Sequence, residues 1–222
     1  MRASRSFLNT VFQYVGNTRN NQIKHYDYSR DYIVWSVEKA LKDLQTDYLD
    51  LLLLHRPSPL MEANEIAAAI SQLKEEGKTL NFGVSNFTAS QVDLLHKQST
   101  VSVNQIEFSL TQHLEMHNGS LDHMILNNIK PMSWSPLGSV FKEDNQTSLR
   151  IKAVLKELCK KYAATEDQIL LACILKHSAG IHPVIGTTNK KRIQNAVKVA
   201  DIALELQDWF GLLVAFQGHK VP

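Results

Sequence analysis

The stretch that decides the fold is YLDLLLLH at residues 48–55. It is almost continuously apolar, which is typical of a parallel strand covered on both faces rather than of a half-exposed antiparallel strand. A helix is expected before it. Ser29 can cap that helix, which ends near Gln45, and its apolar residues recur along one face at Ile33, Val34, Val37, Leu41 and Leu44.

The same alternation continues along the chain. Further strands are expected at 80–84, 101–108, 129–134 and 181–185, with helices between them that include one from about Ser148 to Tyr162. Thr88 and Thr165 are expected helix caps, and Gly77 is an expected helix stop. Strands that alternate with helices over the whole length predict a parallel sheet in an α/β fold.

Polar residues gather where the expected strands end. They are His55-Arg56-Pro57, Ser85-Asn86, Asn104-Gln105, Trp134-Ser135-Pro136 and Gly186-Thr187-Thr188. Periodicity does not decide between an open sheet and a closed barrel, but the chain has neither GxGxxG nor GxxxxGK[ST], the phosphate-binding signatures of open sheets. Polar groups at successive strand ends are typical of the active site of a TIM-type barrel.

Composition excludes several classes of function. The formal net charge is +2, from 24 basic and 22 acidic residues, so nothing favours nucleic acid or an anionic membrane as a partner. No apolar run approaches the roughly 18 residues that span a bilayer. The two cysteines, Cys159 and Cys173, form no CxxC motif and are expected to pack within helices, which fits a reducing, cytoplasmic location.

Five segments occur in an order and spacing that resemble the aldo-keto reductase family, and most closely its bacterial oxidoreductase branch. They are DYLDLLLLHRP, GVSNF, VNQIEFS, SWSPLGS and PVIGTTNKKRI, and the similarity runs from about Ile23 to Pro222. The resemblance implies a TIM (β/α)8-type barrel that binds NADP(H) in extended form. It also implies reduction of aldehydes or ketones, small-molecule carbonyl substrates, to alcohols.

Four positions are implied near the carbonyl and the nicotinamide. A lone histidine at a strand end is more often structural, but His55 matches the family histidine that orients the substrate carbonyl. Ser85 and Asn86, otherwise ordinary turn residues, are implied to bind the nicotinamide carboxamide together with Gln105.

Trp134 offers a flat face to the nicotinamide ring, where many relatives have tyrosine; core packing is the alternative. The resemblance implies that Ser135, Leu137 and Gly138 cover the pyrophosphate. It assigns Gly186, Thr187, Thr188 and Arg192 to the 2′-phosphate, with donors from the helix N-terminus. Some relatives carry lysine where Gly186 stands. The alternative for Arg192, with Lys190 and Lys191, is a solvated helix face.

The catalytic tyrosine, aspartate and lysine of the family have no counterpart in this sequence. The implied barrel is therefore incomplete and lacks about the first two β/α units, with the lysine position falling on Asn9. Residues 1–22 are expected to be a divergent or replaced segment, with a mitochondrial-type leader as the alternative, and residues 23–222 a partial barrel domain. Tyr26, Asp27 and Lys24 are not expected to substitute.

Two alternatives stand beside an active reductase. The chain is then a non-catalytic NADP-binding or regulatory protein, or an inactive fragment of a disrupted gene. The sequence specifies neither the carbonyl substrate nor the oligomeric state. The segment HLEMH at 113–117 lacks the spacing of a zinc site, so no metal is expected. Lys152, Lys156, Lys160 and Lys161 are expected to form the solvated face of a helix.

Overall fold

The computed structural model describes residues 8–11, by their backbone alone, and residues 26–220. The expected divergent segment at 1–22, its alternative as a leader, and Lys24 lie outside the described residues, apart from 8–11. The chain forms two units. The first holds the residues up to Gln105 with Leu126–Ile129, and the second holds Ile106–Ile125 and the residues from Lys130 onward.

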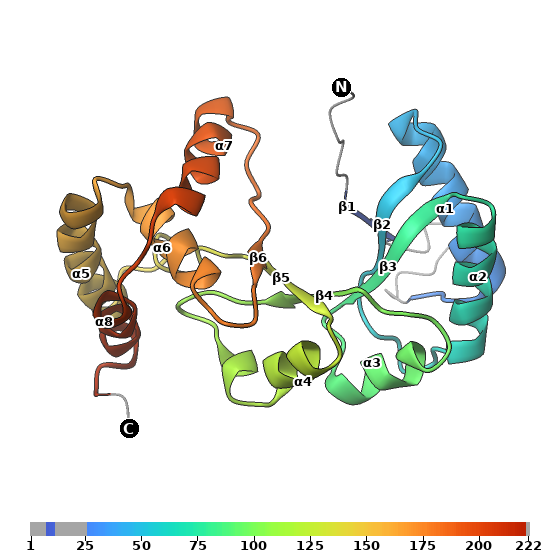
Figure 1. Cartoon of the computed structure of the whole chain (residues 1–222), viewed down its shortest axis with the longest axis horizontal. Helices are drawn as coiled ribbons and strands as arrows, with labels where there is room; N and C mark the ends of the chain where they lie inside the picture. Colours follow the sequence, from blue (N-terminus) through green and yellow to red (C-terminus); the bar gives the residue numbers. More distant parts are fainter. Residues whose placement is uncertain (1–7, 12–25, 221–222) are drawn as a thin grey trace, which may run out of the picture. The chain divides into compact units, whose positions relative to one another are not determined.

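The first unit is a parallel sheet in which a helix follows each of the strands β1, β2 and β3 along the chain (Figure 1). Its strands pair in chain order, with Leu8 opposite Leu51, Leu52 opposite Phe82, and Gly83 opposite Val103. The elements are β1 (Leu8–Val11), α1 (Arg30–Leu44), β2 (Leu49–Leu54), α2 (Ala63–Glu75), β3 (Thr79–Ser85), α3 (Ala89–His96) and β4 (Val103–Glu107), whose last two residues belong to the second unit.

The core of the first unit follows from the apolar patterns. Leu52, Leu53 and Leu54 are fully buried, as a strand covered on both faces requires. Gly83 in β3 allows the neighbouring strands to approach closely. A Cβ at this position would lie 2.6 Å from the Val103 carbonyl oxygen and 2.7 Å from Leu53 Cδ2.

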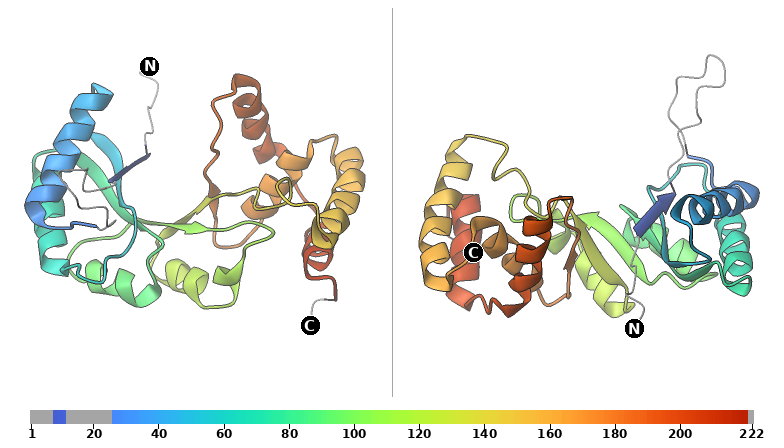
Figure 2. Two further views of the ribbon diagram at one scale, coloured as in Figure 1. Left: turned by 180° about the vertical axis from the view of Figure 1, so that it is seen from behind. Right: turned by 90° about the horizontal axis from the view of Figure 1, so that it is seen from above.

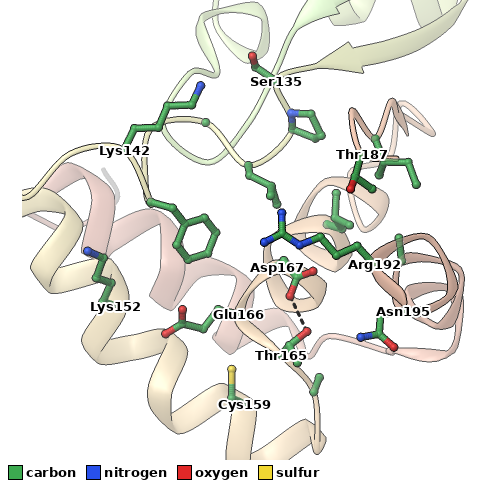
Figure 3. A pocket seen from close by; sticks show the side chains of 18 of the residues that line it. Ser135, Lys142, Lys152, Cys159, Thr165, Glu166, Asp167, Thr187, Arg192 and Asn195 are labelled. Atoms are coloured by element: carbon green, nitrogen blue, oxygen red, sulfur yellow. Dashed lines mark hydrogen bonds between the residues drawn. The ribbon is translucent and has the colours of Figure 1, made fainter. Parts of the chain in front are cut away.

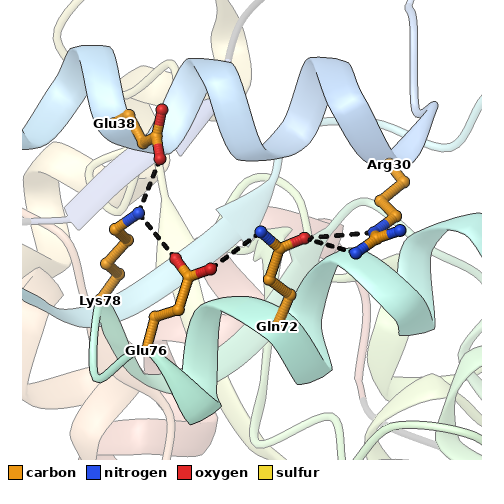
Figure 4. A network of polar contacts seen from close by, with 5 residues as sticks. All are labelled: Arg30, Glu38, Gln72, Glu76 and Lys78. Carbon is orange, nitrogen blue, oxygen red and sulfur yellow. Dashed lines mark hydrogen bonds and ion pairs between the residues drawn. The ribbon is translucent and has the colours of Figure 1, made fainter.

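A polar network joins α1 to α2, which lie side by side (Figure 4). Lys78 Nζ lies 2.6 Å from carboxylate oxygens of both Glu38 and Glu76, and these contacts raise the pKa of Lys78. Arg30 donates to Gln72, which donates to Glu76. Glu38 is exposed and Lys78 only partly buried, so solvent screens these ion pairs, and burial of the apolar helix faces dominates the stability of this layer.

The second unit is mostly helical. It contains η1 (Leu114–Met116), α4 (Ser120–Leu126, except Leu126), β5 (Lys130–Trp134), α5 (Gln146–Tyr162), α6 (Glu166–Leu175), β6 (His182–Pro183), α7 (Lys190–Val197), η2 (Lys198–Asp201) and α8 (Leu206–Gln217) (Figure 2). Strands β5 and β6 pair in parallel, with Met132 opposite His182. Helices α5, α6 and α8 share a core in which Leu155, Ile169 and Leu212 are fully buried.

The α/β fold with a parallel sheet is confirmed, and three details differ from the prediction in their bounds or contacts. The last strand is only two residues long, His182–Pro183, although the Val184 N–H still donates to the Ser133 carbonyl oxygen of β5 at 2.8 Å. Helix α5 begins at Gln146 because Asn145 caps it, accepting from the Ser148 N–H at 2.8 Å. Ser29 sits at the N-cap of α1 but makes no capping hydrogen bond through its side chain.

Two further observations bear on earlier expectations. Cys173 is buried in the core of α5, α6 and α8, and the half-buried Cys159 packs against the same core. Among residues 26–220, no helix is long and apolar enough to cross a membrane.

Candidate functional site

His55 follows directly after the buried strand β2 and is half-buried. The ring of Tyr26 meets it edge-on, with 6.1 Å between the ring centroids, and Tyr26 also stacks on Tyr28. The histidine therefore lies against an aromatic surface supplied by the segment that precedes α1.

Tyr28 fixes the backbone beside His55. Its phenol donates to the Arg56 carbonyl oxygen at 2.5 Å and lies 3.3 Å from the Arg56 N–H. Burial raises the pKa of Tyr28 to about 12, an effect opposed by the hydrogen bond to Arg56 and supported by Tyr26. The neutral phenol thus holds the residue that follows His55.

Replacing Tyr28 with phenylalanine is expected to lower the free energy of unfolding at pH 8 by about 1 kcal/mol, the usual net contribution of one hydrogen bond. Because the pKa is raised in the folded state, the stability contributed by Tyr28 is present below about pH 10 and is lost as pH rises toward 12. The difference between wild type and Y28F, measured by urea denaturation, should therefore shrink from pH 8 to pH 11. A constant difference would contradict this role.

Ser85, Asn86 and Gln105 lie together at the ends of β3 and β4. The Ser85 hydroxyl donates to the Gln105 carbonyl oxygen at 3.0 Å, and the Asn86 N–H donates to the same oxygen at 2.8 Å. The Asn86 amide donates to Ser85 Oγ. Leu54 of β2 pairs with Val84 of β3. His55 follows Leu54 and Ser85 follows Val84, so the two residues lie at matching positions on neighbouring strands. Four of the predicted residues thus share the carboxyl end of this sheet.

Ser135 to Gly138 form a tight turn after β5. The Gly138 N–H donates to the Ser135 carbonyl oxygen at 2.8 Å, and both residues have positive φ, +52° for Ser135 and +57° for Gly138. A Cβ at position 138 would lie 2.1 Å from Thr111 Oγ1, so only glycine fits. The turn therefore presents its backbone at the surface of the second unit.

This turn lines a cavity of about 1420 Å³ that lies entirely within the second unit (Figure 3). The structure brings six of the predicted residues to this cavity: Ser135, Leu137, Gly138, Gly186, Thr187 and Arg192. Trp134, half-buried at the end of β5, and Thr188 do not line it. Figure 3 shows Arg192 and Thr187 on one side of the cavity and Lys142 and Lys152 on the other.

The segment from Gly186 to Arg192 differs from expectation in one respect. Asn189 caps α7 and accepts from the backbone N–H groups of Lys191 and Arg192, at 3.0 and 3.2 Å. These two donors are thus engaged within the protein and do not face an anion. Thr187 Oγ1 accepts from the Asn189 N–H, which leaves the hydroxyl proton available for a ligand.

Several residues of the cavity were not anticipated from the sequence. Lys152, Lys156 and Lys160, expected on a solvated face, line it together with Lys142 and Phe141. Their spacing of four residues places them on one helix face. The four-residue spacing predicts that these lysines share one helix face, but it does not predict that this face lines a cavity.

Residues 7–210 match the sequence model of a known protein family, described as the aldo/keto reductase family. The chain belongs to the aldo/keto reductase family. The matched stretch begins at residue 7, inside the segment that the sequence sets apart as divergent.

Named relatives of this aldo/keto reductase are oxidoreductases. It is 38% identical to oxidoreductase YdhF of Escherichia coli over 208 residues, which are 91% of this chain and 69% of the relative. It is 37% identical to a 6-dehydroglucose reductase of Agrobacterium fabrum, over 93% of this chain and 70% of the relative. By its family, the chain is an oxidoreductase enzyme.

Solved structures support the fold. A thermostable aldo-keto reductase crystallised with the inhibitor epalrestat superposes with a TM-score of 0.77 at 25% identity, over 85% of this chain and 67% of that one. A Bombyx mori aldo-keto reductase in complex with NADP gives a TM-score of 0.75 at 25% identity, over 89% and 67%. This aldo/keto reductase therefore has the α/β barrel fold of the family and spans about two thirds of the length of these relatives' chains.

Proposed function

We propose that the chain binds NADP(H) and takes part in hydride transfer between NADPH and an aldehyde or ketone, or in the reverse alcohol oxidation. Relatives support the cofactor and the substrate class. One relative, 33% identical over 84% of this chain, is an NADPH-dependent alpha-keto amide reductase of Saccharomyces cerevisiae. Another, the 6-dehydroglucose reductase of Agrobacterium fabrum, acts on a sugar carbonyl by its name.

The observation that carries the proposal is the cavity of the second unit. It collects the turn at 135–138 and the Gly186, Thr187 and Arg192 group, two segments about 50 residues apart in sequence that the resemblance assigns to phosphates of one cofactor. About 1420 Å³ gives ample room for the phosphate-bearing half of a dinucleotide. Hydroxyl, backbone and guanidinium donors match phosphate chemistry, so the residues fit the group.

In this proposal, Ser135, Leu137 and Gly138 cover the pyrophosphate. Gly186, Thr187, Thr188 and Arg192 bind the 2′-phosphate, which favours NADP over NAD. Arg192 can grip a phosphate with two parallel N–H donors, and no carboxylate of the described residues lies within 4.0 Å to compete for it.

The remaining residues serve the reacting end. His55 orients the substrate carbonyl; Ser85, Asn86 and Gln105 hold the nicotinamide carboxamide; and Trp134 stacks on the ring. The bound cofactor supplies the hydride. The Ser85 hydroxyl donates to the Gln105 carbonyl oxygen and the Asn86 amide donates to Ser85 Oγ, so these hydrogen bonds hold the three residues together at the position where we propose they contact the carboxamide.

The tyrosine that serves as the proton donor in the family has no matching position in this sequence. We therefore expect a polypeptide of residues 1–222 to bind NADPH but to turn over far more slowly than the family. The test measures the loss of NADPH absorbance when the wild-type chain is mixed with a panel of aldehydes and ketones. The variant His55→Ala is measured beside it. Turnover at ordinary family rates would contradict this expectation.

The second candidate is a non-catalytic NADP-binding or regulatory protein. The proposed cofactor cavity, combined with the lack of a counterpart to the family's proton donor, favours it. Tight NADPH binding without turnover would support it. A broad thermal melt that NADPH does not shift would instead indicate an inactive fragment. We assign residues 23–222 to a partial aldo-keto reductase barrel domain. The two free cysteines fit a reducing, cytoplasmic location.

A further inference from the structure

Positive side chains from three different elements enter the cavity of the second unit. They are Lys142 in the loop after β5, Lys152, Lys156 and Lys160 on α5, and Arg192 on α7, against two carboxylates, Glu166 and Asp167. Two of the lysines are already paired, Lys152 with Asp144 at 2.9 Å and Lys160 with Glu157 at 3.0 Å. For Lys142, Lys156 and Arg192, no carboxylate of the described residues lies within 4.0 Å.

The lysines of helix α5 lie in two different environments. Lys161 turns away from the cavity and binds Glu205 and Asp208, both at 2.8 Å, which raises the pKa of Lys161 and lowers that of Asp208. Lys156 lies one turn from both Lys152 and Lys160, about 6 Å along the helix axis in each direction. It is thus the central lysine of the face that lines the cavity, and the one on that face without an ion pair in the described structure.

At position 186, across the cavity from α5, this chain has glycine and therefore no cationic side chain. Gly186 stands where the resemblance places a lysine in some family members. A Cβ built on Gly186 would meet no atom within 4 Å, so the space beside it is open rather than filled by packing. Arg192 is then the sole cationic residue among those assigned to the 2′-phosphate from sequence.

We propose that Lys156, assisted by Lys142, supplies the cation that Gly186 does not, and so makes this chain select the 2′-phosphate of NADP(H). The inference rests on the proposed function of the cavity. A 2′-phosphate carries nearly two negative charges, and one guanidinium does not balance them. An ammonium is a mobile point charge on a long stem, which suits it to reach such a group across open space.

The test compares binding of four probes to the 222-residue chain by isothermal titration calorimetry: NADPH, NADH, adenosine 2′,5′-bisphosphate and AMP. Lys156→Ala is expected to weaken NADPH and adenosine 2′,5′-bisphosphate about tenfold, the usual loss for one charged contact. NADH and AMP should change by less than about twofold. Lys156→Arg should restore most of the affinity. Lys176→Ala, an exposed lysine of the same unit that does not line the cavity, is the control.

Each outcome decides a different claim. Equal weakening of NADPH and NADH by Lys156→Ala would overturn the selection of the 2′-phosphate and place the lysine at the pyrophosphate instead. No effect on any probe, with wild type binding NADPH, would overturn the inference alone. If wild type binds none of the four probes, the proposed function fails and the inference fails with it. Circular dichroism of each variant excludes unfolding as the cause of any loss.

Discussion

Gly138→Ala should abolish tight NADPH binding and lower the free energy of unfolding by about 3 kcal/mol, which combines the cost of positive φ with that of a steric clash. Gly138 has φ +57°, and an added Cβ would lie 2.1 Å from Thr111 Oγ1 and 2.6 Å from Ser109 Oγ. Thr111 Oγ1 accepts the hydrogen bond of the Ser139 N–H at 3.0 Å, so displacing Thr111 also frees the end of the turn. The turn assigned to the pyrophosphate therefore loses its shape.

Gly119→Ala is the matched control for this variant. Gly119 has φ +81° but an added Cβ there would meet nothing within 4 Å, so it carries the same backbone cost without the clash. Urea denaturation and NADPH titration of both variants separate the two contributions. Equal losses of stability and affinity in the two variants would show that the packing of Thr111 against Gly138 does not shape the site.

The second large effect concerns Arg192. Arg192→Ala is expected to weaken NADPH binding about 30- to 100-fold and NADH binding less than about threefold, because a bidentate, charged contact to phosphate is among the strongest that proteins make. The Arg192 side chain lines the cavity next to Thr187 (Figure 3). It takes no part in the cap of α7, which is made by Asn189, so the helix should survive the substitution.

Lys191→Ala controls for the loss of one positive charge on the same helix. Lys191 precedes Arg192, is exposed and does not line the cavity. Its replacement should change NADPH affinity by less than about twofold, apart from weak screened electrostatics. A comparable loss in both variants would mean that a diffuse field, and no specific contact with Arg192, determines affinity.

Much of this architecture can be predicted from the chain itself. The buried strand at 49–54, the helix caps at Thr88 and Thr165 and the polar strand ends carry their signals locally, in apolar runs and in residue types suited to particular backbone conformations. His55, Ser85 and Gln105 could be placed at one sheet edge because parallel strands end on the same side.

Other features depend on contacts between distant segments. The lysines at 152, 156 and 160 resemble any solvated helix face until the fold brings the Ser135–Gly138 turn and α7 to the same cavity. The pairing of Lys161 with Glu205 and Asp208 likewise joins residues more than 40 positions apart. The cap by Asn189 is predictable from the sequence in principle, because Asn directly before a helix is a common N-cap residue.

The start of the chain is a further instance. The sequence at 1–22 shows no clear likeness by motif, yet β1 at Leu8–Val11 pairs in parallel with β2, and the family match begins at residue 7. A strand of only four residues at the edge of a sheet leaves too short a pattern to identify without its partner strand. Asn9, opposite Leu52 in this pairing, is where the resemblance places the family lysine.

The central claim is that the cavity of the second unit binds the 2′-phosphate half of NADP(H). The most direct measurement is calorimetric titration of the 222-residue chain with NADPH and with NADH under the same salt conditions. Binding of NADPH at least about tenfold tighter than NADH, a difference of roughly 1.4 kcal/mol, is the predicted result. Equal affinities for the two, or binding of neither, would contradict the claim.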